Sequence, residues 1–184
     1  LAKMWRDGIV DGCRKEIHRF RSVAAAWTGV DPTDLDIIED NPHFELYDPE
    51  YVLHPRTVTK FDHFVSINNA ITVDLLGQIN AETVFGGRMI NGTGGQPEMH
   101  LAGAFSPGGR AITLLPSTAM GGAVSRIVAQ MEPGSFVTIP RFFADYVITE
   151  FGVARLWGKN HRQRAEELIA IVHPDHRDDL RRQA

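Results

Sequence analysis

The sequence has only one cysteine and no long hydrophobic run, and these two absences narrow the classes of protein to consider. Cys13 stands alone among 184 residues, so an internal disulfide is excluded and we expect a reducing compartment, the cytoplasm. The longest apolar stretches fall far short of the roughly 18 residues that a membrane-spanning helix needs. The chain also lacks an initiator Met and a basic-then-apolar leader. We therefore expect no targeting signal and interpret the chain, which opens mid-pattern at Leu1, as a processed or cloned fragment.

Positive charge is scarce as well. The chain has 19 Lys and Arg against 23 Asp and Glu, a formal net charge of −4. This balance argues against nucleic acid or an anionic membrane as the main partner. Hydrophobic residues make up 43% and charged residues 23% of the chain, which is ordinary for a globular protein and excludes wholesale disorder.

The first part of the chain differs from the rest in its charge and proline content. Residues 31–50 hold eight carboxylates and no Lys or Arg, a pattern typical of a solvated connection. Four prolines between Pro32 and Pro55 keep any helix around Asp34–Asp40 short. We predict a leading segment over residues 1–60, with a short helix near Leu1–Arg6 and an edge strand within Phe44–Leu53.

From Phe64 onward, short apolar runs alternate with turn-forming residues. Runs of four to six apolar residues flanked by Gly and Pro favour buried strands over helices. Eleven of the 17 glycines fall between Gly77 and Gly122, which predicts tight glycine-rich loops between the strands. The predicted strands lie at 64–67, 71–75, 111–115, 135–139 and 146–149.

The C-terminal part of the chain has the pattern of helices. Asn160 and Gln163 match a capping box, in which the Asn side chain accepts a hydrogen bond from a first-turn amide. A helical apolar face follows, formed by Ala165, Leu168, Ile169 and Val172, and Pro174 ends that helix. A second, charged helix is predicted over Asp175–Arg182. Strands in the middle and helices at the ends indicate an α/β domain with a mixed or mostly parallel sheet.

Three local features carry candidate chemistry, and each has a purely structural alternative. Asn91–Gln96 contains three glycines, whose backbone amides can converge on an anion or form a simple tight turn; it lies in no clear strand-to-helix turn and is neither a dinucleotide fingerprint nor a Walker A loop. The amides of residues 66–82 either orient a substrate carbonyl or satisfy buried backbone groups. Glu150 follows a predicted strand, where catalytic carboxylates are often found, but it is equally suited to a cap or an ion pair. The scattered histidines predict no metal site.

Seven sequence blocks, in order, resemble the C-terminal domain of the acetyl-CoA hydrolase/transferase family, which includes 4-hydroxybutyrate and acetate/butyrate CoA-transferases. The resemblance covers about residues 60–180, and the segment Asp36–Pro42 is similar to the connection that precedes this domain. The blocks are Val65–Ala70 with Val73–Glu82, Gly92–Gln96, Pro116–Ala119, Ser125–Val128, Val147–Ala154, Arg164–Ala165 and His173–Arg177.

The resemblance implies a NagB/RpiA/CoA-transferase-like three-layer domain over residues 61–184, the C-terminal half of a two-domain enzyme. It implies an acyl-CoA:carboxylate CoA-transferase that works through a glutamyl-CoA thioester. The family's nucleophilic Glu precedes this domain in a His-Thr/Ser-Glu stretch that this sequence lacks. We therefore expect the chain alone to be inactive, with acyl-CoA, a small carboxylic acid, the missing N-terminal domain and a second copy of the chain as partners.

The resemblance also assigns supporting residues. Asn68 matches the amide beside the reacting carbonyl, and Glu150 matches an acidic residue near the active site. The positions that line CoA match Ile71, Gly92, Gly94, Gly95 and Gln96. We add Arg126 as a candidate for a CoA phosphate or a substrate carboxylate, because Arg presents forked donors. Pro97 and Glu98-Met99 depart from the family pattern, which bears on the acyl-chain preference.

Two other functions remain open. A thioester hydrolase would use water as the final acceptor, and a non-catalytic acyl-CoA-binding module would keep the fold without the chemistry. Dependence of turnover on an added carboxylate separates transferase from hydrolase, and the sequence that precedes Leu1 separates enzyme from binding module.

Overall fold

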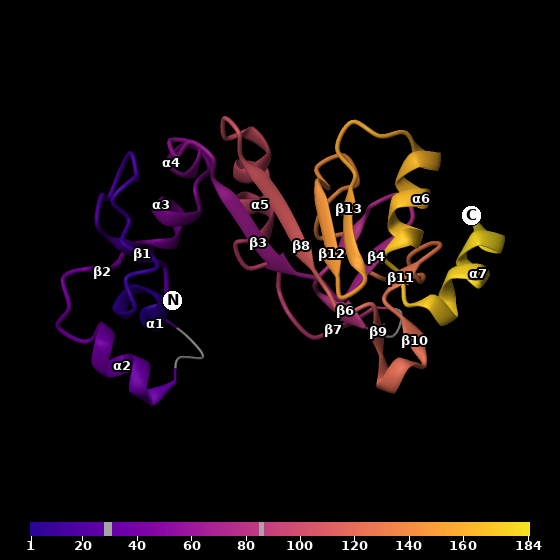
Figure 1. Cartoon of the computed structure of the whole chain (residues 1–184), viewed down its shortest axis with the longest axis horizontal. Helices are drawn as coiled ribbons and strands as arrows, with labels where there is room; N and C mark the ends of the chain where they lie inside the picture. The colour runs from indigo at the N-terminus through magenta and orange to yellow at the C-terminus, as the bar shows by residue number, and fades with distance from the viewer. Residues whose placement is uncertain (28–30, 85–86) are drawn as a thin grey trace.

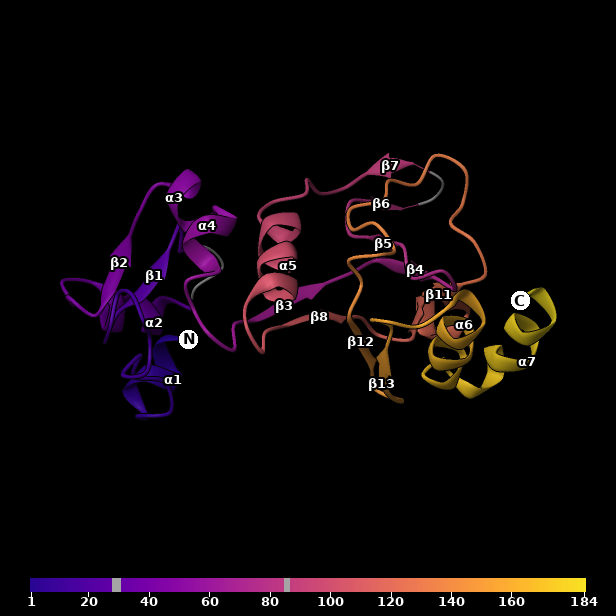
Figure 2. The same cartoon turned by 90° about the horizontal axis from the view of Figure 1, so that it is seen from above.

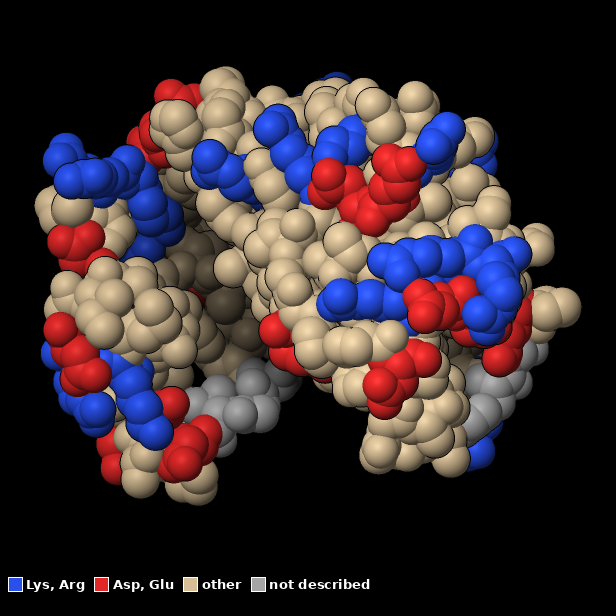
Figure 3. All heavy atoms as spheres, turned by 45° about the vertical axis from the view of Figure 1, so that its right-hand side comes forward, with Lys and Arg blue, Asp and Glu red and all other residues tan. Residues whose placement is uncertain are grey.

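Two lobes of unequal size make up the computed structural model, which describes residues 1–27, 31–84 and 87–184 (Figure 1). The smaller, N-terminal lobe comprises residues 1–58, and the larger body holds the main sheet and the C-terminal helices. A cavity of about 780 Å³ lies at the lobe junction, lined by the loop 9–18, by residues 57, 58 and 61–65 and by Met99 among others. Figure 3 shows the recess between the lobe and the body.

Short, proline-started helices build the N-terminal lobe: α1 (Ala2–Arg6), α2 (Pro32–Ile38), α3 (Pro49–Leu53) and α4 (Pro55–Val58), of which only α1 lacks the proline. Asp31 and Asp48 cap α2 and α3, because each carboxylate accepts a hydrogen bond from a first-turn amide. Strands β1 (Ser22–Ala24) and β2 (Phe44–Leu46) pair in parallel, with α2 between them in the chain. The predicted strand over Phe44–Leu53 was wrong beyond Leu46, since Pro49 begins α3.

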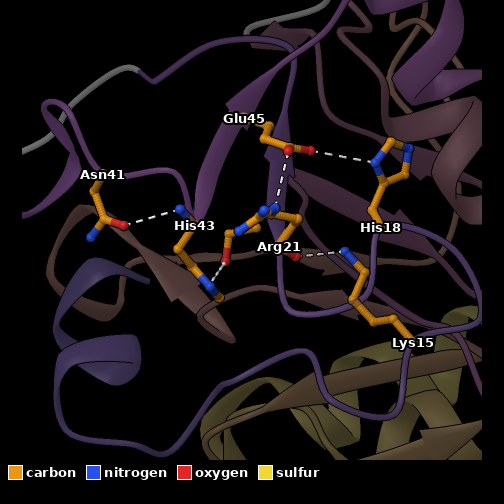
Figure 4. Close-up of polar contacts among 7 residues, drawn as sticks. Lys15, His18, Arg21, Asn41, His43 and Glu45 are labelled. Atoms are coloured by element: carbon orange, nitrogen blue, oxygen red, sulfur yellow. Dashed lines mark hydrogen bonds and ion pairs between the residues drawn. The ribbon is translucent and has the colours of Figure 1, made fainter.

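A polar network joins β1 to β2 (Figure 4). The Ser22 hydroxyl and His43 Nε2 lie 2.9 Å apart in a buried hydrogen bond, and the Arg21 guanidinium pairs with the Glu45 carboxylate at 3.1 Å. His18 lies 3.4 Å from the same carboxylate. These polar contacts supplement the aromatic packing of Trp5 and Trp27 on Phe44 in holding the short strand pair.

The main sheet contains four strands in the order β13-β12-β8-β3. Strands β3 (Val65–Asn69), β8 (Arg110–Leu114) and β12 (Tyr146–Thr149) are parallel, and β13 (Gly152–Arg155) returns antiparallel beside β12. Helix α5 (Gln96–Phe105) packs on β3 and β8, and α6 (His161–Ala170) packs on β13. The arrangement is a mixed α/β fold with mostly parallel strands, as predicted.

Smaller strand groups and a final helix lie beside this sheet, on the side away from the N-terminal lobe (Figure 2). A three-stranded sheet has the order β11-β4-β5, and β6/β7 and β9/β10 form antiparallel pairs. No helix within the described residues is both long and apolar enough to cross a bilayer. The bounds are β4 (Thr72–Asp74), β5 (Ile79–Asn80), β6 (Thr83–Val84), β7 (Arg88–Met89), β9 (Thr118–Ala119), the 3₁₀ turn η1 (Met120–Gly122), β10 (Val124–Ser125), β11 (Ile127–Val128) and α7 (Pro174–Gln183).

Most predicted elements of the body are present, with two corrections. The capping box of Asn160 and Gln163 forms as predicted, and the helix predicted over Asp175–Arg182 is α7. The run 135–139 was wrong as a strand, because it makes only one bridge, between Ile139 and Ile79, and Pro140 interrupts it. The glycine-rich middle of the chain also contains a helix that was not predicted, α5, which begins directly after the run Gly92–Gly95.

The helix-covered face of the main sheet is lined by small side chains. A Cβ atom on Gly103 of α5 would lie 3.2 Å from the Ser66 Cβ atom and 2.7 Å from the Arg110 carbonyl oxygen. On the same face, Val147 and Ala154 are fully buried in one apolar cluster with Leu168 of α6. Small residues therefore let α5 approach the sheet closely.

His100, on α5, is a fully buried titratable group of this interface. Its Nε2 lies 3.0 Å from the Phe143 carbonyl oxygen, and its Nδ1 makes no hydrogen bond among the described residues. Burial lowers the pKa of His100 from 6.5 to about 4, although the hydrogen bond to Phe143 acts in the opposite direction. The imidazole is thus neutral in the folded chain at pH 7.

We expect His100 to make the chain acid-sensitive. In the unfolded chain the His100 pKa is near 6.5, so its imidazole binds a proton at a pH where the folded chain keeps it neutral. The free energy of unfolding therefore falls as the pH drops from about 6.5 to 4. The loss is about 3 kcal/mol at pH 4. Urea unfolding at pH 7 and pH 4 measures it, with His100→Gln as the comparison. If the variant lost as much stability as the parent chain over this range, His100 would not be the cause.

Candidate active site

Parallel pairing of β3, β8 and β12 brings the residues that follow these strands to one edge of the sheet. Asn68 lies at the end of β3, Ser117 follows β8 and Glu150 follows β12. Asn68 is half-buried, and its Nδ2 donates to the Ser66 hydroxyl at 2.8 Å. The carboxyl edge of a parallel sheet is where open α/β folds bind ligands, so we treat this edge as the candidate site.

Helix α5 places the glycine run beside the N-terminal lobe rather than at this edge. The Ser106 hydroxyl, just beyond the end of α5, accepts from the Phe64 amide at 3.1 Å and donates to the Phe61 carbonyl at 2.6 Å. The C-terminus of α5 therefore lies at the start of β3. The N-terminal half of α5 faces the N-terminal lobe, because a Cβ atom on Gly95 would meet Leu53 of α3 and Met99 lines the lobe-junction cavity. The contacts of α5 therefore do not bring Gly92–Gly95 to Asn68 at the end of β3.

The three glycines of this run differ in whether the structure requires a glycine at their position. Gly94 has a φ of +53°, which disfavours other residues. Gly95 caps α5 with a φ of −93°, and a Cβ atom there would lie 2.5 Å from a methyl carbon of Leu53 on α3. Gly92 is exposed, and a Cβ atom would meet nothing within 4 Å. The run is a strand-to-helix connection, contrary to the sequence interpretation.

The contact with Leu53 gives a direct expectation for Gly95→Val. The new side chain would push α3 away from α5, at a cost of about 1–3 kcal/mol of folding stability. Gly92→Val is the matched control and should leave stability nearly unchanged. Chemical denaturation measures both. Adding Leu53→Ala to Gly95→Val should restore part of the loss, and failure to do so would remove this contact as the cause.

Gln96 is the first residue of α5, and it combines burial with an unused donor. The residue is only 8% exposed, and its Nε2 has no hydrogen-bond partner among the residues described. A buried amide without a partner costs free energy. Gln96 is therefore a candidate donor for a ligand group held at the start of α5.

Glu150 organises a chain of hydrogen bonds across the edge. Its carboxylate accepts from the Ser117 amide at 2.9 Å and from the Ser117 hydroxyl at 2.5 Å. The Ser117 carbonyl then accepts from the Arg126 amide, and the Arg126 carbonyl accepts from the Val73 amide on β4, both at 2.9 Å. One carboxylate thus links the main sheet to the sheet formed by β11, β4 and β5.

The hydrogen bonds from Ser117 lower the pKa of Glu150 from its ordinary value, and nearby His173 acts in the same direction more weakly. The side chain is therefore an anion at neutral pH, and the exposure of Glu150 to solvent favours the same charged form. An anion accepts hydrogen bonds but has no proton to give. This favours a positioning role for Glu150 over a role as a general acid.

Arg126 and Ile71 lie beside this chain of hydrogen bonds. The Arg126 Nε is buried and has no hydrogen-bond partner within the described part of the chain, which leaves a donor for an anion. Ile71 sits between β3 and β4, and its amide donates to the Asn80 carbonyl at 2.8 Å. The structure thus gathers Ile71, Arg126 and Glu150 near the end of β3.

Other polar residues of the amide-rich stretch have structural roles. Asn80 is 1% exposed, and its side chain bonds to Glu82 and Thr83 in a tight turn. The Asp74 carboxylate accepts from Leu76 and Gln78. The structural alternative is therefore right for Asn80, and the Asp74 side chain likewise stabilises its own turn.

Sequence reasoning missed two features of this region. Ser117, which is buried and binds Glu150, was not among the candidate residues; its place in the Pro116–Ala119 block was the available signal. The lobe-junction cavity, the largest of those described, had no sequence signal, and none of the predicted site residues lines it. It lies at the start of β3, away from the candidate edge.

Comparison with known proteins places this geometry in a family context. Residues 34–184 match the acetyl-CoA hydrolase/transferase C-terminal domain. A succinyl-CoA:cyclohexane-1-carboxylate CoA transferase of Geobacter metallireducens is 41% identical over 98% of this chain and 41% of its own length. A 4-hydroxybutyrate coenzyme A transferase of Clostridium kluyveri is 40% identical over 98% of this chain and 42% of its own length.

A solved structure agrees with these relatives. The crystal structure of RipA from Yersinia pestis superposes with a TM-score of 0.92 at 35% identity, covering 100% of this chain and 41% of that one. The chain therefore spans about two fifths of the length of these three proteins.

Proposed function

Because the chain belongs to the acetyl-CoA hydrolase/transferase family, whose C-terminal domain it contains, we propose that it is the C-terminal part of an acyl-CoA:carboxylate CoA-transferase. The substrates would be an acyl-CoA and a small carboxylic acid. The observation that supports the proposal is the edge of the main sheet, where Asn68 ends β3 and the Glu150–Ser117–Arg126 chain of hydrogen bonds follows β8 and β12. The acetyl-CoA and 4-hydroxybutyryl-CoA types are the substrate classes that we favour.

The proposed route needs a glutamate from the part of the protein that precedes this chain. Its carboxylate attacks the thioester carbonyl, and the C–S bond breaks to give an acyl–glutamyl anhydride and CoA thiolate. The thiolate then attacks the glutamyl carbonyl, releasing the carboxylate and leaving a glutamyl-CoA thioester. The acceptor carboxylate reverses these steps and leaves as the new acyl-CoA.

Residues of this chain would stabilise the charge that develops in that route. The Asn68 amide would donate to the oxyanion, and backbone amides of Gly94 and Gly95 and the unused Nε2 of Gln96 would line the CoA thioester and pantetheine. Gly92 and Ile71 would border the same path. Arg126 would hold a carboxylate or phosphate through its free Nε donor. Glu150 would keep Ser117 and Arg126 in place as a positioning residue.

We further propose that residues 61–184 form two layers of a NagB/RpiA-type three-layer domain, preceded by a connection over residues 1–60, in a cytoplasmic, two-domain and homodimeric enzyme. Thioester hydrolysis is the second candidate, because the family name covers both activities. No metal has a role in the proposed route.

The decisive experiment is an assay of the longer chain, with the N-terminal part restored, against a panel of acyl-CoAs and carboxylates. CoA transfer that requires the added carboxylate supports the transferase. CoA release at an equal rate without it supports the hydrolase. CoA binding without either product would leave only a binding module.

A further inference from the structure

One face of the main sheet is apolar and carries no helix. Side chains alternate between the two faces along each strand, so the register separates them cleanly. On β3, Ser66 is buried while Ile67 is 60% exposed, and on β13 Ala154 is buried while Val153 is 57% exposed. The open face, as we call it, consists of the apolar residues Val65, Ile67, Ile112, Leu114, Tyr146, Ile148 and Val153, with Asn69 at one end and Arg110 and Arg155 at the other, all exposed or partly exposed.

The polarity of the two faces is the reverse of that in an ordinary one-sided sheet. The buried face contains small or polar residues such as Ser66, Ala111 and Thr113, whereas the open face contains mostly large apolar ones. Parallel strands in folded proteins are normally covered on both faces. Here α5 and α6 both cover the buried face, and in Figure 1 no helix of the described residues lies in front of β8 and β12.

The open face continues into the lobe-junction cavity. Val65 belongs to the open face and also lines the cavity, beside Phe64 and Met99. Across the cavity, β1 and β2 form a parallel pair with no third strand among the described residues. An isolated pair of strands is marginally stable. Within the described part of the chain, this pair lacks a further strand on one side of the cavity, and on the other side the main sheet lacks a helix on its open face.

The length of the relatives says what is absent. They are more than twice as long as this chain, and the matched family region is a C-terminal domain. We propose that the open face is the surface on which the preceding, N-terminal part of the same polypeptide packs, through at least one amphipathic helix laid across β3, β8 and β12. This inference rests on the proposed function only in taking the chain as part of a longer enzyme.

Two arginines at one end of the open face indicate the charge that the partner helix should carry. Arg110 and Arg155 lie at the same end of the face and are exposed, and no ion pair is formed by either within the described residues. The Arg155 guanidinium lies 5.8 Å from the centre of the Tyr146 ring. The partner helix should therefore carry apolar residues at helical spacing and acidic residues where it crosses these arginines.

Cysteine accessibility tests the inference directly. Cys13, the single native cysteine, is first replaced by Ser, and Ile67→Cys or Val153→Cys is then introduced into both the 184-residue chain and the longer chain. Phe142→Cys is the matched control, because Phe142 is 66% exposed and lies outside the open face. The rate of reaction with a thiol reagent is measured for each protein.

In the 184-residue chain we expect all three cysteines to react rapidly. In the longer chain, the two on the open face should react at least about tenfold more slowly, while the control stays fast. Equal rates in both chains would overturn the inference, and so would slowing of all three. Protection within the 184-residue chain that disappears on dilution would assign the face to a second copy instead.

The result is separable from the proposed function. The activity of the longer chain is measured on the same preparations. A protected open face in a longer chain that transfers no CoA would contradict the proposed function and support the docking surface. An accessible open face in an active transferase would support the proposed function and contradict the docking surface.

Discussion

On its own, the 184-residue chain is expected to transfer no CoA from acetyl-CoA to a carboxylate above the uncatalysed rate, whereas the longer chain should turn over at roughly 1 s⁻¹ or faster. The covalent route cannot start without the glutamate that forms the intermediate. The two carboxylates of this chain that we consider as replacements are already engaged: Glu150 binds Ser117, and Glu82 is buried and accepts from the Thr138 hydroxyl. The measurement is acyl-CoA formation by the purified chain.

Turnover by this chain at a rate near that of the longer chain would contradict the expectation. It would make Glu150 or Glu82 the nucleophile, and Glu150→Gln and Glu82→Gln would then show which. A mixture of the chain with its separately produced N-terminal part is the positive control. Recovery of turnover in that mixture would confirm that the isolated chain is folded and lacks only the missing groups.

Asn68→Ala in the longer chain is expected to lower kcat about 10²–10³-fold, with little change in the melting temperature. A single lost donor to an oxyanion costs about 2.7–4 kcal/mol of transition-state stabilisation. The structural cost should be small, because the half-buried Asn68 side chain makes a hydrogen bond only to Ser66 among the residues described. Steady-state kinetics and thermal unfolding on the same samples provide the two readouts.

Asn80→Ala is the matched control for that variant. Asn80 is also an amide of the same stretch, but it is buried and holds its turn through several hydrogen bonds. Its loss should cost on the order of 3 kcal/mol of stability, because buried backbone groups are left unpaired. A lowered melting temperature with unchanged kcat for Asn68→Ala would place Asn68 in the same structural class and leave the glycine run as the local support for CoA binding.

Sequence predicted the elements whose signals are local. The capping box at Asn160, the strand β12 and the prolines that bound the short N-terminal helices depend on residues within a few positions of each other. Helix α5 was missed because three glycines precede it and Gly103 lies within it, and a glycine-rich stretch favours loops. The reason for Gly103 is a close approach to Ser66 and Arg110, which are distant in sequence.

The candidate site shows the same limit. Asn68 and Glu150 were predicted at strand ends, and the parallel sheet indeed brings these ends to one edge. The partnership of Glu150 with Ser117 depends on the pairing of β8 with β12, which no local pattern reveals. The identity of the open face could not be predicted, since Ile67 and Ile148 have the pattern of core residues and only the observed placement of α5 and α6 shows which face lacks a cover.

The wiring of the main sheet has a consequence for how the chain folds. Strands β12 and β13 are joined by a tight turn at Glu150 and Phe151, so this hairpin can form within microseconds. The pairing of β3 with β8 instead joins Val65 to Arg110 across several smaller strands and all of α5. Closing such a long loop costs conformational entropy before any contact between β3 and β8 can offset that cost. We therefore expect assembly to start at the β12–β13 hairpin and α6, with β3 docking last, so that the strand carrying Asn68 orders at the end of folding.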